Sequence, residues 1–128
     1  MKSTYLYIGL VIIIVVGLVT IRNKSNESEV LATTPFDVFS QCLTDAGAKF
    51  YGAYWCPHCQ EQKKMLKNSK RLPYIECSTP DGKGRTKECI DANIQGYPTW
   101  DFADGTRKDA VLSLKELSDI TKCELPTT

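Results

Sequence analysis

The sequence carries little net charge and only one histidine. Its 16 Lys and Arg residues nearly balance 15 Asp and Glu residues, so the formal net charge is +1. This balance provides no global field for nucleic acid or for an acidic partner. A structural zinc site usually needs a second ligand pair at matched spacing, and His58 is the sole histidine. No metal or other cofactor is therefore expected. Internal repeats are also absent, and 128 residues are enough for one small domain but not two.

Cysteine, in contrast, is abundant. Six cysteines in so short a chain indicate a compartment that permits disulfides, unless they bind metal. On these redox grounds we expect the folded domain to lie outside the cytosol, in the periplasm or an equivalent space.

The N-terminal segment is almost wholly apolar from Tyr5 to Ile21, and no charged residue interrupts it. About 18 helical residues span about 27 Å, close to the thickness of a hydrocarbon core. A cleaved signal peptide is the alternative, but the run exceeds a typical signal-peptide core and no convincing cleavage site follows it. A buried helix of a soluble domain would not be apolar on every face. We predict a single-pass membrane anchor over residues 1–22.

The membrane orientation of this anchor does not follow from charge. Basic residues flank it on both sides, with Lys2 before it and Arg22 and Lys24 after it. Residues 23–35 are polar and end in Thr-Thr-Pro, which predicts a flexible tether. The folded domain is expected over residues 36–128.

Within that domain, apolar patterns, caps and turns predict the order helix, strand, helix, strand, helix, strand, strand, helix. The expected helices cover roughly residues 36–46, 57–69, 86–92 and 113–121, and the strands residues 49–53, 73–77, 98–102 and 108–112. Asp104-Gly105 predicts a hairpin turn. Ser113 with Glu116 predicts a capping box. A parallel pair joined by a crossover helix, followed by a hairpin and a closing helix, gives a mixed sheet covered on both faces.

The strongest chemical signal is the dithiol motif Cys56-Pro57-His58-Cys59. Cys56 falls at a predicted helix start, where unpaired N–H groups and the helix dipole stabilise a thiolate, so it is the expected nucleophile. Pro57 suits the first helical turn. His58 can add positive charge or a hydrogen bond. Cys59, one turn further in and more buried, is the expected resolving thiol.

Several motifs recur in order around this dithiol. They are Gly47-Ala48-Lys49-Phe50-Tyr51-Gly52-Ala53, Trp55 before the dithiol, Leu72-Pro73-Tyr74-Ile75-Glu76-Cys77 and Tyr97-Pro98-Thr99-Trp100. Over residues 36–117 the chain resembles the thioredoxin-like domain that is fused to, or partnered with, vitamin K epoxide reductase homologues. The resemblance implies an α/β thioredoxin-like fold. It also implies a cis bond before Pro98, which would align the substrate backbone. We expect Trp55, Tyr97 and Thr99 in the substrate groove.

The direction of electron flow is addressed by two features of the resemblance. The Pro57-His58 pair resembles that of the strongly oxidising DsbA-like enzymes. Many thioredoxin-like enzymes carry a buried carboxylate six residues before the first active-site cysteine, but this chain has Phe50 there. Lys49 and Tyr51 do not obviously replace that carboxylate, which disfavours reduction of the thioredoxin type.

The other four cysteines can pair in three ways once the dithiol is set aside. We favour Cys77–Cys89, because this bond closes the loop that contains Gly82 and Gly84. Cys42–Cys123 would then join the first helix to the C-terminal tail. Both bonds are expected to be structural, although Cys77–Cys89 could instead relay electrons.

These features predict a membrane-anchored thiol–disulfide oxidoreductase that acts on protein thiols and disulfides. Its redox partner would be a quinone-coupled membrane protein of the vitamin K epoxide reductase or DsbB type. The alternatives are a non-catalytic dithiol binding or metal-delivery module, and a reductase or isomerase with the opposite electron flow. The basic run over residues 63–71 is read as a solvated helix face and not as a nucleic-acid site.

Overall fold

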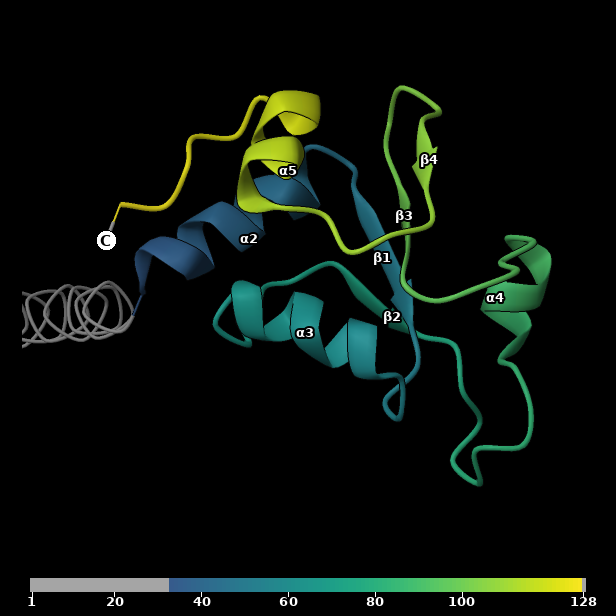
Figure 1. Ribbon diagram of the computed structural model, residues 1–128. Helices are drawn as coiled ribbons and strands as arrows, with labels where there is room; N and C mark the ends of the chain where they lie inside the picture. The colour runs from purple at the N-terminus through teal and green to yellow at the C-terminus, as the bar shows by residue number, and fades with distance from the viewer. Residues whose placement is uncertain (1–32, 128) are drawn as a thin grey trace, which may run out of the picture. The chain divides into compact units, whose positions relative to one another are not determined.

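The computed structural model describes residues 33–127, so the predicted anchor and most of the predicted tether lie outside the described residues. Figure 1 shows helices and strands in the predicted order. The helices are α2 (Pro35–Asp45), α3 (Pro57–Met65), α4 (Lys87–Asp91) and α5 (Leu114–Thr121). The strands are β1 (Lys49–Gly52), β2 (Tyr74–Glu76), β3 (Thr99–Asp101) and β4 (Arg107–Lys108). Within residues 33–127, no helix has the length and apolarity required to cross a membrane.

The strands form one mixed sheet in the order β2-β1-β3-β4. Strand β1 runs parallel to β2, with Phe50 opposite Tyr74, and antiparallel to β3, with Phe50 opposite Trp100. A parallel neighbour requires a crossover connection, which α3 supplies. The dithiol motif therefore begins at the N-cap of α3 and continues into its first turn, with three residues between it and the end of β1.

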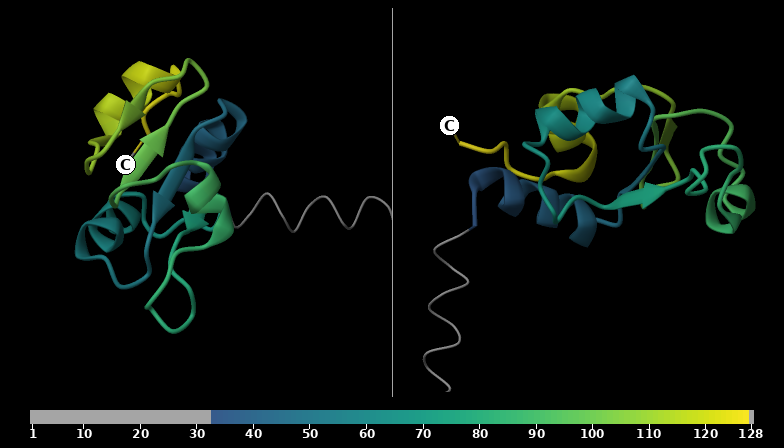
Figure 2. Two further views of the ribbon diagram at one scale, coloured as in Figure 1. Left: turned by 90° about the vertical axis from the view of Figure 1, so that its right-hand side faces the viewer. Right: turned by 90° about the horizontal axis from the view of Figure 1, so that it is seen from below.

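Two apolar clusters cover the two faces of the sheet. The larger cluster contains Phe39 of α2, Phe50 of β1, Leu66 of α3 and Leu117 of α5. The smaller cluster contains Tyr51, Cys77, Cys89 and Ile94. Strand residues alternate between faces, so Phe50 and Tyr51 point to opposite clusters. Figures 1 and 2 accordingly show α4 apart from the other three labelled helices. A mixed four-stranded sheet with helices on both faces fits the predicted thioredoxin-like fold.

Helix caps and turns agree closely with the sequence patterns. Ser113 and Glu116 form the predicted capping box of α5. Thr34 and Asp37 form a second one, so α2 begins at Pro35 and the compact unit at Thr34, slightly before the expected residue 36. In the predicted hairpin, Gly105 has a φ of +84°, a value that favours glycine.

Two predicted elements end four residues before the expected position, whereas the ends of the other elements agree with the prediction to within one residue. Helix α3 ends at Met65 rather than residue 69, because Lys67 and Asn68 adopt positive φ and leave the helical conformation. Strand β4 covers two residues rather than the expected 108–112. The chain leaves the sheet after Lys108 because the backbone of Leu112 is bound by a side chain of α3, Gln62, instead of a neighbouring strand.

Candidate active site

The first cysteine of the motif is held at the start of α3. Cys56 is the N-cap residue and Pro57 is the first helical residue, as the sequence predicted. Proline fits there because its missing N–H is one that the first turn would leave unbonded. Cys56 is 6% exposed, so its sulfur is close to the surface without projecting from it. The free N–H groups of the first turn point toward the capping position.

The second cysteine lies one helical turn deeper. Cys59 has no exposed surface, and neither it nor Cys56 is in a disulfide, so the described chain has the dithiol in its reduced form. Burial raises the pKa of the Cys59 thiol to about 12, and a hydrogen bond with Cys56 acts in the same direction. The buried thiol is therefore protonated at neutral pH, and an attack by Cys59 must begin with loss of this proton.

The loop before β3 lies next to the dithiol. The Tyr97–Pro98 peptide bond is cis, as expected. The Cys56 Sγ donates to the Tyr97 carbonyl oxygen over 3.8 Å. The structure thus brings together two motifs that are about 40 residues apart in sequence.

A groove of about 500 Å³ opens beside this loop. Its aromatic wall is made by Trp55 and Tyr97, whose rings meet edge to face with centroids 6.1 Å apart. Residues 82–85, Gln95 and Gly96 complete the lining. Trp55 is half exposed, and its Nε1 donates to the Ser78 hydroxyl over 2.9 Å. The ring is therefore both accessible and held in place.

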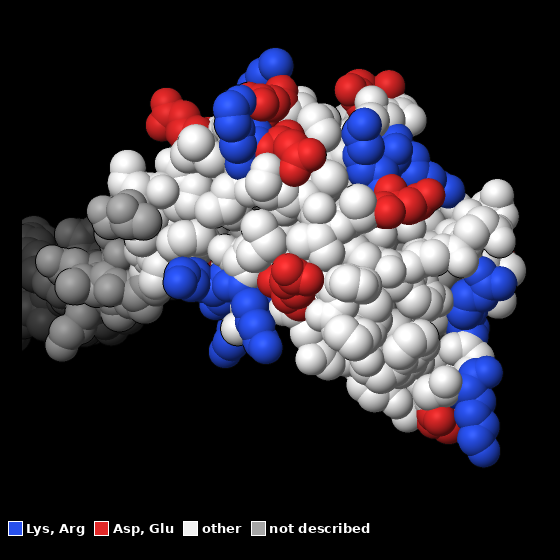
Figure 3. Space-filling model, viewed as in Figure 1, with Lys and Arg blue, Asp and Glu red and all other residues white. Residues whose placement is uncertain are grey.

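The surface around the dithiol differs from the other end of α3. Figure 3 shows mostly uncharged surface around the N-terminal end of the helix, whereas Lys and Arg side chains gather near its C-terminal end. The exposed basic residues there are Lys64, Lys67, Lys70 and Arg71. The charged run is thus separated from the reactive thiol.

Two other predicted site residues, His58 and Thr99, do not contact the groove as site residues would. His58 is highly exposed, and its Nδ1 lies 3.5 Å from the Glu61 carboxylate. Thr99 is buried and is not among the groove-lining residues. Its hydroxyl contacts the Gly96 carbonyl at 2.8 Å and the Asp109 carboxylate at 2.7 Å. Thr99 therefore positions the groove loop from behind.

A buried amide fixes the inner face of α3. The Gln62 Nε2 donates to the Leu112 carbonyl over 3.0 Å, and the Gln62 Oε1 accepts from the Leu112 N–H at 2.7 Å. The same oxygen accepts from the Trp100 indole at 3.3 Å. Buried polar groups are costly unless bonded, so these three bonds hold α3 against β3 and the segment after β4.

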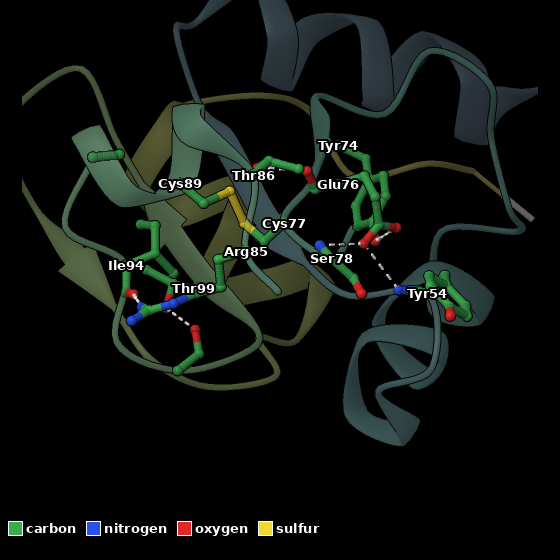
Figure 4. The surroundings of a disulfide bond; sticks show 12 residues. Tyr54, Tyr74, Glu76, Cys77, Ser78, Arg85, Thr86, Cys89, Ile94 and Thr99 are labelled. Atoms are coloured by element: carbon green, nitrogen blue, oxygen red, sulfur yellow. Dashed lines mark hydrogen bonds between the residues drawn. A yellow bond between two sulfur atoms is a disulfide. The ribbon is translucent and has the colours of Figure 1, made fainter. Parts of the chain in front are cut away.

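The remaining four cysteines form the two disulfides favoured from the sequence. Cys42–Cys123 joins α2 to the C-terminal tail, and Cys77–Cys89 joins the end of β2 to α4. Figure 4 shows the second bond beside the segment that leads to the groove wall. That segment is closed by hydrogen bonds from the Thr86 N–H to the Cys77 carbonyl and from the Thr79 N–H to the Gly84 carbonyl. Within residues 33–127, no three His, Cys, Asp or Glu side chains are grouped as metal ligands would be.

A polar cluster that the motif analysis did not assign lies behind Cys59. The Lys63 Nζ lies 3.2 Å from the centroid of the Tyr74 ring, and the Tyr74 hydroxyl donates to Glu76 over 2.7 Å. The other Glu76 oxygen accepts from the Tyr54 and Ser78 N–H groups, as Figure 4 shows. Lys63 stands four residues after Cys59, a helical spacing that puts both on one face of α3. This spacing is the signal in the sequence from which the proximity of Lys63 to the thiol could have been predicted.

Comparison with known proteins adds one informative match. The described fold, with a C-x-x-C dithiol at a helix start, fits the thioredoxin-like class. The chain is 41% identical over 97 residues to the thiol-disulfide oxidoreductase LTO1 of Arabidopsis thaliana. The match covers 70% of this chain, which spans about a quarter of the length of that curated relative (25%). No protein-family model matches the chain.

Proposed function

We propose that this protein is a protein thiol–disulfide oxidoreductase whose reacting groups are Cys56 and Cys59. The observation that carries the proposal is the placement of Cys56 at the N-cap of α3, beside the Tyr97 carbonyl, with Cys59 buried one turn behind it. The similarity to a relative named as a thiol-disulfide oxidoreductase supports the same chemistry.

In the oxidising direction, the reaction begins with a Cys56–Cys59 disulfide. A substrate thiolate attacks the Cys56 sulfur, the Cys56–Cys59 bond breaks, and the electron pair leaves with Cys59 as its thiolate, which takes a proton from water. A second substrate thiolate then attacks the substrate sulfur of the mixed disulfide, and Cys56 leaves as a thiolate. The substrate loses two electrons to the dithiol, and both sulfurs of the protein end reduced.

The groove between Trp55 and residues 82–85 is the proposed docking site for an extended segment of the substrate. Tyr97 lines it and also accepts a hydrogen bond from Cys56 through its carbonyl, and the half-exposed indole of Trp55 provides apolar contact area. Trp55 and Tyr97 would contact the segment, whereas Pro98 and Thr99 are buried outside the groove lining and would support the loop from inside.

Anchoring and recycling complete the proposal. The apolar run from Tyr5 to Ile21 would hold the domain at a membrane, and the two disulfides fit an extracytoplasmic location. A quinone-coupled membrane protein of the vitamin K epoxide reductase or DsbB type would take the two electrons from the reduced dithiol. Fractionation of cells that express the full chain tests the anchor, since a carbonate-extractable protein would contradict it.

The exchange activity is tested by trapping. A Cys59→Ser variant should accumulate disulfide-linked complexes with cellular proteins, which non-reducing gels resolve and a reductant dissolves. The matched Cys56→Ser variant, whose remaining thiol is fully buried, should accumulate none. If the Cys59→Ser variant traps no more protein than the Cys56→Ser variant, the exchange enzyme is excluded.

A further inference from the structure

The polar cluster behind Cys59 takes part, we propose, in the exchange reaction: Lys63, held over the ring of Tyr74, supplies the positive charge that stabilises the Cys59 thiolate. This inference rests on the proposed exchange between Cys56 and Cys59. It assigns a role to a lysine of α3 in a chain that has Phe50 at the carboxylate position of related enzymes.

The first step of the argument is that the cluster and the thiol meet at one point. A Cβ atom built on Gly52 would lie 2.9 Å from the Cys59 Sγ and 2.8 Å from the Tyr74 Cε2. The sulfur and the ring edge therefore converge over the same glycine, and any larger residue there would collide with both. Lys63, one turn beyond Cys59 on α3, lies over that same ring.

The second step concerns how the ammonium is held. An ammonium at 3.2 Å from a ring centroid makes a close cation–π contact. The ring is fixed in turn by the Tyr74 hydroxyl bond to Glu76, and by Phe50, which meets it edge to face with centroids 5.1 Å apart. Phe50 thus occupies the carboxylate position and supports the ring that holds the lysine.

The third step is electrostatic. Burial raises the pKa of Cys59, whereas the charge of Lys63 acts to lower it. Burial also lowers the pKa of Lys63, and the negative charges of Glu76 and of the Cys59 thiolate partly counteract this effect. The titratable groups that act on Cys59 from the surrounding elements are Cys56, Lys63, Tyr74 and Tyr97. Lys63 is the cation among them.

The fourth step is a route for the proton. A cavity of about 330 Å³ is lined by Lys63, Tyr74, Leu72 and residues 68–70. This space borders Lys63 and Tyr74, whereas Cys59 is not among its lining residues. When Cys59 attacks a mixed disulfide at Cys56, its proton passes to water, the new Cys56–Cys59 bond forms, and the partner leaves as a thiolate. In the reverse reaction, Cys59 is the leaving group and the same charge stabilises it.

The test uses an aromatic disulfide that releases one coloured thiolate at each step. Reduced protein first attacks with Cys56 in a phase that depends on reagent concentration, and Cys59 then releases the second thiolate in a concentration-independent phase. A Lys63→Met variant should slow the second phase about threefold to tenfold at pH 8, because one pKa unit changes the thiolate fraction tenfold. The first phase should change less than twofold. This experiment needs no natural substrate, so its outcome is independent of the trapping result.

Two further variants separate charge from packing. Lys63→Arg keeps the charge and should restore the second phase to within about twofold of the original. Lys64→Met removes a charge from an exposed position of the same helix and should leave both phases unchanged. The proposal is overturned if Lys63→Met leaves the second phase unchanged between pH 7 and 9, or if Lys64→Met slows it equally.

Discussion

The Sγ of Cys56 lies 3.8 Å from the carbonyl oxygen of Tyr97, which joins the start of α3 to the loop before β3. This contact places the outer thiol at the edge of the groove, because Tyr97 also lines that groove. In the proposed function, a substrate segment docked along Trp55 and Tyr97 would therefore bring its cysteine toward Cys56. The inner thiol, in contrast, has no exposed surface.

Replacement of Trp55 by alanine should weaken the use of peptide and protein substrates. The indole supplies exposed apolar surface at the groove, so its loss should raise KM for a cysteine-containing peptide at least about fivefold. The reaction with a small disulfide should change less than twofold. Ile90→Ala is the matched control, since Ile90 is similarly exposed but does not line the groove. Equal losses for the peptide and the small disulfide would contradict this role.

The stability of the reduced protein should fall in alkaline solution. The pKa of Cys59 is raised from 9.0 to about 12 in the folded chain, so folding favours the protonated thiol. The stabilisation is complete below pH 9 and is lost as the pH rises toward 12, with a limiting slope of about 1.4 kcal/mol per pH unit. Urea unfolding between pH 8 and 10.5 should show a steeper decline for the reduced protein than for Cys59→Ala. Parallel curves would contradict the raised pKa.

Replacement of Gln62 by leucine should destabilise the fold by at least about 2 kcal/mol. The change leaves the N–H groups of Leu112 and Trp100 without their present acceptor in a buried setting. Denaturant unfolding measures the loss. Lys64→Leu, a change of similar size at an exposed site of the same helix, should stay within about 0.5 kcal/mol. A tolerated Gln62→Leu would mean that the amide bonds add little.

The two disulfides should differ in their contribution to stability. Their cysteines are separated by 81 residues in Cys42–Cys123 and by 12 in Cys77–Cys89. In the chain-entropy model, closure of loops of these lengths contributes about 4.5 and about 3 kcal/mol. Paired Cys→Ala variants, unfolded in urea, should follow this order. The reverse order would show that loop closure does not determine their effects.

A structural role for Cys77–Cys89 has a kinetic consequence. In the Cys77→Ala/Cys89→Ala variant, the rate of the first phase, in which Cys56 attacks a small aromatic disulfide, should stay within about twofold of the original. The Cys42→Ala/Cys123→Ala variant serves as the control for general loosening of the fold. If only the Cys77–Cys89 pair is needed for turnover with a membrane partner, this bond relays electrons instead.

Local patterns in the sequence predicted most of the fold. The capping box of Ser113, the Asp104-Gly105 turn and the helix that starts at Pro57 depend on residues within a few positions of one another. The reactive cysteines could be predicted for a related reason, because the C-x-x-C spacing of Cys56 and Cys59 is itself a local pattern that indicates a redox-active dithiol. The similarity of the motifs to a known family supplied Pro98.

Contacts between segments that are distant in sequence could not be predicted from such local patterns. Gln62 carries no local signal for its buried hydrogen bonds, because its partner Leu112 is 50 residues away. The same contact shortened β4, whose apolar pattern suggested a longer strand. Tyr74 and Lys63 become neighbours only because β2 pairs in parallel with β1. Such pairs depend on sheet register, which the periodicity of either segment alone does not determine.

The reduction potential of the Cys56–Cys59 pair is the most direct test of the proposed oxidising function. The protein would be equilibrated in glutathione buffers of defined ratio, and the fraction of disulfide measured by the mass of the alkylated peptide. The account predicts a potential closer to about −120 mV than to about −270 mV, the values of a strong oxidant and of thioredoxin. A potential near −270 mV would reverse the electron flow, and a pair that forms no disulfide at all would contradict exchange through these two cysteines.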